Sequence, residues 1–317
     1  MTLANQITGW ALRYEGSTRA AGLMRIGLVL LIWGRFAGSM LPKHDLHLPW
    51  ILFGMTFFVA TGLMLVGLWS RLSSLLVSGV VFTNYFYFGH YLGNAYWAGH
   101  HVYLLAIACF FLALTPCGKS YSLDRWRALH RAERRGQPAP KEWGNLWGMR
   151  LIAFQLSMVY FWAAFSKANP AFLSGDRLQQ LIYANFPGPD YSQFFLFEPL
   201  TMVAAIGVVI LQLALAFGLH FPWGRKYLMP LGIVMHLAFY VLLYAFTFSL
   251  TMILLYLAFI PAGTVHRVLN QMQGVSMPEA RPDNPLLSKS RFMEAGVQPA
   301  APTKRKAAPL AGRTALR

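Results

Sequence analysis

The feature that most constrains this chain is a series of apolar runs, each long enough to cross a lipid bilayer. A spanning helix needs about 20 apolar residues, because a helix rises about 1.5 Å per residue and the hydrocarbon core is about 30 Å thick. The clear runs cover residues 21–41, 49–69, 72–90, 99–115, 146–167, 200–221 and 227–261. The composition agrees, since 56% of the 317 residues are apolar and only 12% are charged, too few to cover a water-soluble domain.

The last run is too long for one span. As a single helix it would be about 52 Å long, so we predict two short spans with a break around Thr247 to Ser249. The chain is therefore predicted to be an all-α integral membrane protein, a bundle of about eight transmembrane helices with short interfacial helices. We expect no cleavable signal peptide, because the first run is long enough to span and contains Arg25 and Arg35.

Positive charge is distributed unevenly between loops on alternate sides of these spans. If the amino terminus is inside, the outer side receives Lys43, Lys167 and Arg177, whereas most of the 27 Lys and Arg residues, including those of loop 119–141, lie inside. Cytoplasmic loops carry such an excess, so we predict a multi-pass protein of the bacterial inner membrane with both termini in the cytoplasm. The net charge of +16 then requires no nucleic acid, because the anionic inner leaflet of the lipid bilayer is a sufficient partner.

The predicted spans leave little room for a second domain. We divide the chain into an N-terminal interfacial segment (1–20), a transmembrane domain (21–265) and a basic cytoplasmic tail (266–317) that lacks apolar periodicity and is predicted to be disordered. Ser122 is placed to cap a short basic helix that carries Trp126, and we expect this helix to lie on the inner membrane face. Cys109 and Cys117 are too few for a disulfide framework or a metal site, and no metal is predicted.

The predicted topology places five of the nine histidines, together with Asp45, Lys167 and Asp176, at or near the outer ends of the spans. Such a gathering at one membrane face indicates a pocket that opens outward. The alternative is that interfacial histidines simply bridge lipid and water. Tyr87 and Asn84 either belong to this pocket or only stabilise the packing of neighbouring helices. The titratable residues on this side are His44, Asp45, His47, His90, His100, His101, Lys167 and Asp176.

Lys167 ends a long apolar run that contains no carboxylate to pair with it. Removal from water disfavours the ammonium form, so a lysine held there is a candidate base, although a lysine near a span end can also bend its head group to the interface. Tyr160 lies on the same helical face as Lys167. The segment that begins at Asp176 has Leu178 and Leu181 on one side and is predicted to be an interfacial lid.

Several segments, taken in order, resemble the HTTM domain, the membrane portion shared with vitamin K-dependent γ-carboxylase. They are AGHHVYLLAIACFFLALTPCGKSYSLDRW (98–126), the helix end at Lys167, and HLAFYVLLYAFTFSLTMILLYLAFIP (236–261). The resemblance covers about residues 20–265. It implies that Lys167 corresponds to the carboxylase lysine that deprotonates a reduced naphthoquinone, and His101 to a histidine that assists the quinone chemistry. In the carboxylase, oxygen then adds, and the strong base that results removes a γ-proton from a peptide glutamate before CO2 is captured.

The resemblance has a clear limit. The sequence contains no counterpart of the large extramembrane domain through which the carboxylase engages its protein substrate, so peptide carboxylation is not expected. Bacterial relatives of this size also resemble the membrane partner that matures a secreted toxin, of the sporulation-delaying protein B type.

Our main hypothesis is an outward pocket for oxygen-dependent chemistry on a lipid-soluble quinol, of the γ-carboxylase or quinol-epoxidase kind. Lys167 would abstract a phenolic proton, and His101 would polarise the phenolic hydroxyl or relay the proton. A reduced quinone with O2 would be the cofactor and co-substrate. Candidate ligand-binding residues are His100, Tyr160, His90, Tyr87, Arg35 and His236. For His236, inside the seventh span, a hydrogen bond to a helix carbonyl is an equal alternative.

Two other functions remain open from the sequence. The first is a non-catalytic membrane accessory protein for maturation or export of a secreted peptide, in which Lys167 is structural. The second is a di-iron lipid hydroxylase, prompted by the histidines of HDLH (44–47) and by the pair His100 and His101. It is disfavoured because such a site needs many histidines to converge on metal.

Overall fold

The computed structural model describes residues 14–41, 47–188 and 190–273. Most of the interfacial segment expected at residues 1–20, the residues His44 and Asp45, and the tail from residue 274 onward lie outside the described residues. The described residues as far as Met272 belong to one unit.

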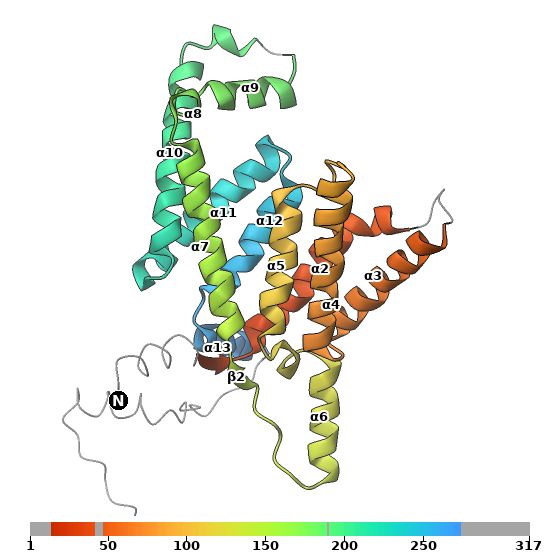
Figure 1. Ribbon diagram of the computed structural model, residues 1–317. Coiled ribbons are helices and arrows are strands. Elements are labelled where there is room, and N and C mark those ends of the chain that lie inside the picture. Colours follow the sequence, from red (N-terminus) through yellow and green to blue (C-terminus); the bar gives the residue numbers. More distant parts are fainter. Residues whose placement is uncertain (1–13, 42–46, 189, 274–317) are drawn as a thin grey trace, which may run out of the picture. The chain divides into compact units, whose positions relative to one another are not determined.

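Helices make up nearly all of this unit (Figure 1). The main helices are α2 (Arg19–Met40), α3 (Leu48–Val66), α4 (Ser70–Thr83), α5 (His100–Ala113), α7 (Trp147–Lys167), α10 (Phe197–Gly218), α11 (Pro222–Leu242) and α12 (Phe246–Leu255). A π-helix, η1 (Asn84–Tyr91), continues α4. The shorter elements are β1 (Glu15–Ser17), η2 (Cys117–Lys119), α6 (Leu123–Arg134), β2 (Trp143–Asn145), α8 (Pro170–Leu173), α9 (Asp176–Asn185), η3 (Tyr191–Gln193), η4 (Tyr256–Ala258) and α13 (Ala262–Met272). Each predicted run therefore holds one main helix, and the last run holds two.

The all-α membrane architecture predicted from the sequence is confirmed, and the count of eight spans is approximate. Among the described residues, α2, α3, α4 with η1, α7 and α10 are long and apolar enough to cross a membrane. The helix of α12 and η4 forms, with α13, a pair bent by 100° that could count as a sixth span. The 14 residues of α5 reach only about 21 Å, and α11 has Arg225, Lys226 and Pro230 in its first half.

Three boundaries differ from those predicted. The last run breaks at residues 243–245 rather than at Thr247 to Ser249, because the backbone of Tyr244 adopts a left-handed conformation (φ 51°) that ends α11. Helix α13 continues to Met272, so residues 266–272 of the predicted disordered tail are helical. Residues 15–17, placed in the interfacial segment, form a strand that pairs antiparallel with β2.

The core of the bundle is built on α2, which contacts α3, α5, α12 and α13. Its side chains Met24, Leu28, Ile32 and Phe36 are fully buried. By contrast, α10 presents an apolar stripe outward, with Leu200, Val203, Ile210 and Phe217 each more than half exposed. Large apolar side chains exposed at helical spacing are suited to contact with lipid chains.

One buried charge organises the end of the bundle where α3 turns into α4. The guanidinium of Arg25 is fully buried and donates hydrogen bonds to the carbonyls of Met64 (2.8 Å) and Tyr121 (2.6 Å). Met64 lies in the last turn of α3, where a positive charge is favourable. Gly67 ends α3 with φ 70°, and a Cβ there would overlap the Arg25 guanidinium. The close packing of the Arg25 guanidinium against Gly67 therefore fixes the conformation of this turn.

Loop 117–124 is bound to the same turn by Asp124. Its carboxylate accepts hydrogen bonds from the backbone N–H groups of Trp69 (3.0 Å) and Ser70 (2.8 Å) and from the Ser70 hydroxyl (2.8 Å), which caps the start of α4. Ser122 caps α6 as predicted, because its hydroxyl accepts from the backbone N–H of Arg125 (2.9 Å). Helix α6 extends from the bundle beyond the end of α4 rather than lying across that end (Figure 1), which differs from our expectation.

The strand pair and α13 close the same end of the bundle. Arg19 forms an ion pair with Glu142 (2.6 Å) and also donates to the side-chain oxygen of Asn270 in α13 (2.5 Å). The Ser17 hydroxyl lies 3.0 Å from Nδ1 of His266. These contacts join segments far apart in the chain. They also hold the second half of α13 against the bundle, so that this helix continues past residue 265, the predicted end of the transmembrane domain.

We predict that Arg25→Met lowers the free energy of unfolding by about 2–4 kcal/mol, because the buried carbonyls of Met64 and Tyr121 lose a charged donor. Thermal or denaturant unfolding in detergent micelles measures this. The matched control is Arg127→Met, since Arg127 is exposed on α6 and its replacement should change stability by less than about 0.5 kcal/mol. Equal stabilities of the two variants would contradict this role for Arg25.

The orientation in the membrane can be tested with single cysteines at opposite ends of the bundle. Arg131→Cys lies on α6 and Gln180→Cys on α9, two helices at opposite ends of the bundle (Figure 1). Both positions are exposed, and the native Cys109 and Cys117 are buried. With the basic loop inside, a membrane-impermeant maleimide should label position 180 in spheroplasts and reach position 131 only after the membrane is permeabilised. Labelling of position 131 in intact spheroplasts would reverse the predicted topology.

Candidate functional site

Lys167 is the last residue of α7 and is half-buried. Its amine donates a hydrogen bond to the carbonyl of Ala163 (3.1 Å) and lies 6.0 Å from the ring centroid of Phe172. No carboxylate among the described residues forms an ion pair with it. Asn169 caps α8 directly afterwards by accepting from the backbone N–H of Phe172, so the chain turns away just beyond the amine.

Two turns below Lys167, on the same face of α7, Tyr160 belongs to a closed polar cluster. Its hydroxyl lies 2.7 Å from Nε2 of His236 on α11 and 2.5 Å from the hydroxyl of Tyr256 on η4. All three side chains are at most 2% exposed. Because polar groups in an apolar interior need partners, this triad fixes the relative positions of three segments.

The histidine of the triad keeps one free polar atom. Nδ1 of His236 is buried and has no hydrogen-bond partner among the described residues, while the Phe239 and Phe248 rings pack 5.9 and 5.8 Å from the imidazole. Gly232 lies one turn before His236, and a Cβ at that position would overlap the Tyr256 hydroxyl. The structure therefore gives His236 a tyrosine partner instead of the helix carbonyl considered from the sequence.

His101 lies in a separate cluster at the start of α5. Its Nε2 is 3.3 Å from Nε of Arg35 on α2. The Arg35 guanidinium stacks over the ring of Tyr96 at 3.7 Å, and the Tyr96 hydroxyl donates to the Arg35 carbonyl (2.6 Å). The structure thus brings together Arg35, a predicted ligand-binding residue, and His101, a predicted catalytic residue, and the contact of Arg35 with Tyr96 was not foreseen.

The structure does not bring Lys167 and His101 into contact. The partners of Lys167 come from α7 and α8, whereas those of His101 come from α2. We expected one pocket around both residues, and the described contacts place them in two separate clusters. The difference arises because the pairing of helix ends depends on how α5, α7 and α12 pack, which the order of apolar runs does not specify.

The remaining candidates lie on η1 and at the start of α5. His90 is exposed and packs against the Tyr85 ring at 4.6 Å, and Tyr87, also exposed, stacks on Tyr91 at 5.5 Å. His100 is exposed beside His101. Asn84, the first residue of the π-helix, is fully buried, and neither polar atom of its side chain has a partner in the part of the chain that the structure describes. Among the described residues, no hydrogen bond or ring contact joins any of these side chains to Lys167.

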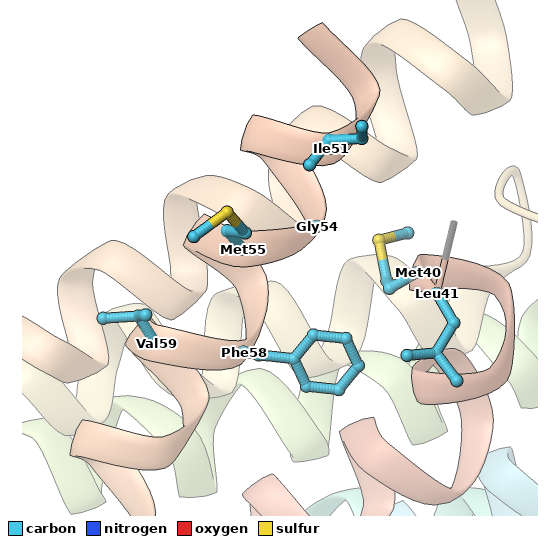
Figure 2. A pocket seen from close by; sticks show the side chains of 7 residues that line it. All are labelled: Met40, Leu41, Ile51, Gly54, Met55, Phe58 and Val59. Carbon is cyan, nitrogen blue, oxygen red and sulfur yellow. The ribbon is translucent and has the colours of Figure 1, made fainter. Parts of the chain in front are cut away.

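A hollow of about 220 Å³ lies between the end of α2 and the first half of α3 (Figure 2). In Figure 2 the ring of Phe58 on α3 faces Met40 and Leu41 at the end of α2. The lining is apolar and holds none of the predicted site residues. It consists of Met40, Leu41, Ile51, Gly54, Met55, Phe58 and Val59.

Sequence reasoning missed Tyr256 and Tyr96. Tyr256 is a single tyrosine in the apolar run 250–260, and this pattern does not predict a buried hydroxyl. A polar atom in such a run does indicate that a hydrogen-bond partner is needed. Tyr96 stands in a short polar connection between spans, where an aromatic residue is also common at the membrane interface. Among the described residues, no three His, Cys, Asp or Glu side chains gather in a way that could hold a metal ion.

Comparison with known proteins identifies the family. A family model described as the HTTM domain matches residues 38–263, more than half of the chain. The chain belongs to the HTTM domain family. The HTTM match begins near the end of α2 and runs to the start of α13, so it includes His101, Tyr160, Lys167 and His236 and begins just after Arg35. No curated protein and no solved structure matches.

We predict that the hydroxyl of Tyr160 stabilises the HTTM domain through His236 and Tyr256. Tyr160→Phe should lower the free energy of unfolding by about 1–3 kcal/mol, because two buried partners lose their hydrogen bond. In a double-mutant cycle, the loss in Tyr160→Phe with Tyr256→Phe should be smaller than the sum of the single losses. Tyr91→Phe is the control, since Tyr91 is 78% exposed. Strict additivity would show that the two hydroxyls do not interact.

Proposed function

We propose that this HTTM protein binds a lipid-soluble quinol at the end of α7, and that Lys167 accepts a proton from the phenolic hydroxyl. The observation that carries the proposal is the half-buried amine of Lys167, which is bound to a single backbone carbonyl and forms no ion pair with a carboxylate among the described residues. A lysine sheltered in this way has a usable lone pair once it is neutral.

The surroundings of Lys167 favour a ligand that arrives from the lipid. The neighbouring side chains Trp162 and Phe165 on α7 are 60% and 65% exposed, as expected for a face in contact with lipid. On the face of α7 that carries Lys167, Ala164 is buried and small, and Tyr160 follows one turn further down. A phenolic ring can therefore approach the amine along α7 without entering water.

Helix α9 lies at the same end of the bundle and supports the predicted lid. Gln179 donates to the hydroxyl of Thr201 on α10 (3.0 Å), and Asn185 donates to the carbonyl of Leu242 on α11 (3.2 Å). Its predicted apolar side, with Leu178 and Leu181, is the half-buried one. A segment fixed at both ends to different helices can limit the access of water to the bundle end.

The chemistry proposed for this site follows the resemblance of the sequence, with one change. The quinol gives its phenolic proton to Lys167, and O2 adds to the phenolate that remains, as the resemblance implies. His101 is left out of the proton transfer because its described partner is Arg35. Tyr160, on the face of Lys167, is the nearer polar group along α7, and it is itself held by His236.

Oxygen uptake by the purified protein tests this function. With reduced menaquinone or ubiquinone, wild-type protein should consume O2, and Lys167→Ala should lower the rate at least about 100-fold, the usual contribution of a general base. The matched control is Lys226→Ala, because Lys226 is exposed and packs on Tyr227 at 5.0 Å. The absence of uptake by the wild type, or equal uptake by the Lys167→Ala variant, would end the enzyme proposal.

The alternative accessory function has one observation in its favour. Between η3 and α10, Phe194 and Phe195 are 51% and 81% exposed, and Tyr183 on α9 is 40% exposed. An aromatic surface at a bundle end suits docking of a peptide. This alternative predicts that Lys167→Ala leaves the function in cells intact, whereas substitutions at Leu178 or Leu181 abolish it.

A further inference from the structure

Arg35 is a charged side chain near the end of a membrane-spanning helix without an acidic partner. It lies five residues before the end of α2 and is half-buried. No Asp or Glu among the described residues forms an ion pair with it. An ionisable residue within a span is costly and normally pairs with an opposite charge or with backbone carbonyls, so an incompletely paired one marks a functional position.

The contacts of Arg35 hold its guanidinium in place without using all of its donors. Nε donates toward His101 (3.3 Å), Nη2 donates to the Tyr96 carbonyl (3.4 Å), and the guanidinium carbon lies 3.7 Å from the Tyr96 ring centroid. A guanidinium has N–H donors on all three nitrogens, and here Nη1 makes no hydrogen bond within the described chain. The Arg35 guanidinium is therefore held in place, while its Nη1 donors have no partner within the described chain.

Arg25 on the same helix is the comparison within this protein, although its Nε has no hydrogen-bond partner among the described residues. It is fully buried, and its hydrogen bonds to Met64 and Tyr121 are 2.8 and 2.6 Å long. Those of Arg35 are 3.3 and 3.4 Å long, near the limit for such bonds, and one of them goes to a ring nitrogen. The difference indicates that Arg35 lacks its strongest partner.

Among the described residues, no Asp or Glu belongs to the cluster around Arg35. Helix α5, which supplies His101, has no acidic residue in its first turn, and the neighbouring His100 is exposed. A guanidinium presents parallel N–H groups that match the two oxygens of a carboxylate or phosphate. An oxyanion from outside the chain can therefore act as the partner that the described residues do not supply.

The exposed face of α2 beside Arg35 has room for an apolar chain. A Cβ built on Gly34 or Gly38 would meet nothing within 4 Å, and the flanking Leu30 and Leu41 are 55% and 50% exposed. An open track of this kind along a membrane-spanning helix suits the hydrocarbon chain of a lipid better than it suits a small hydrated ion.

We propose that Arg35, with Tyr96 and His101, binds the oxyanion headgroup of a lipid whose chain lies along Gly34 and Gly38. The site is separate from Lys167 and does not depend on quinol chemistry. It lies at the end of α2, and Arg35 precedes the residues matched by the HTTM family model.

Native mass spectrometry of the full-length protein in detergent tests this site. The probes are dioctanoyl phosphatidylglycerol, dioctanoylglycerol, which has the chains without the oxyanion, and inorganic phosphate, which has the oxyanion without the chains. Wild-type protein should bind the phosphatidylglycerol at least about tenfold more tightly than either other probe, the gain expected of one charge-assisted pair. Arg35→Gln should remove this preference, and the control Arg127→Gln, which removes an exposed charge on α6, should keep it.

Two further variants keep the test decisive if Arg35→Gln does not fold. Arg35→Lys retains the positive charge but lacks the parallel N–H donors of the guanidinium, so it should bind the phosphatidylglycerol more weakly than wild type. Gly34→Leu fills the open track, where a Cβ meets no atom, and should weaken binding of the lipid while Arg35 is unchanged. Equal affinity of wild type and the Arg35 variants would overturn the proposal. Tight, Arg35-dependent binding of inorganic phosphate alone would overturn the assignment to a lipid.

Discussion

Polar and charged groups enclosed by the membrane-spanning helices have to find partners within the chain, because lipid offers none. Arg25 meets this requirement through two backbone carbonyls, while its Nε has no partner among the described residues. It is buried against the last turn of α3, it binds the loop that leads to α6, and Gly67 leaves the space that the guanidinium occupies. Asp124 binds the other side of the same turn by capping α4. The α3–α4 turn and the start of the basic loop are thus fixed by one cation and one anion that never meet as an ion pair in the described structure.

The same requirement separates structural from functional candidates. Tyr160, His236 and Tyr256 satisfy one another except at a single imidazole nitrogen, and they join α7, α11 and η4. Lys167 and Arg35 are different, since each has donors left over, each is only half-buried, and neither pairs with a described carboxylate. N–H donors without a partner near the ends of membrane helices favour ligand binding, because the folded protein already holds the charge in the membrane. We therefore regard these two cations as the positions where the molecule binds something from outside.

The apolar runs were sufficient to predict the all-α membrane fold, each main helix and the cap at Ser122, because hydrophobicity and capping are local properties. The break at Tyr244 could not be predicted, since the run contains no glycine or proline there and the turn depends on a left-handed tyrosine. The site was predicted only in part. Spacing alone placed Tyr160 on the face of Lys167, but the separation of His101 from Lys167 and the closure of the triad by Tyr256 result from packing between distant helices. The sequence does not encode such packing at any single position.

The central claim is that Lys167 faces a ligand from the membrane, and protection of its amine tests this most directly. Purified protein would be treated with a membrane-permeant amine reagent, with and without reduced menaquinone, and modification of each lysine would be followed by peptide mass spectrometry. The account predicts that the quinol slows modification of Lys167 several-fold and leaves the exposed Lys226 unaffected. Modification of Lys167 at the same rate with and without the quinol would contradict it.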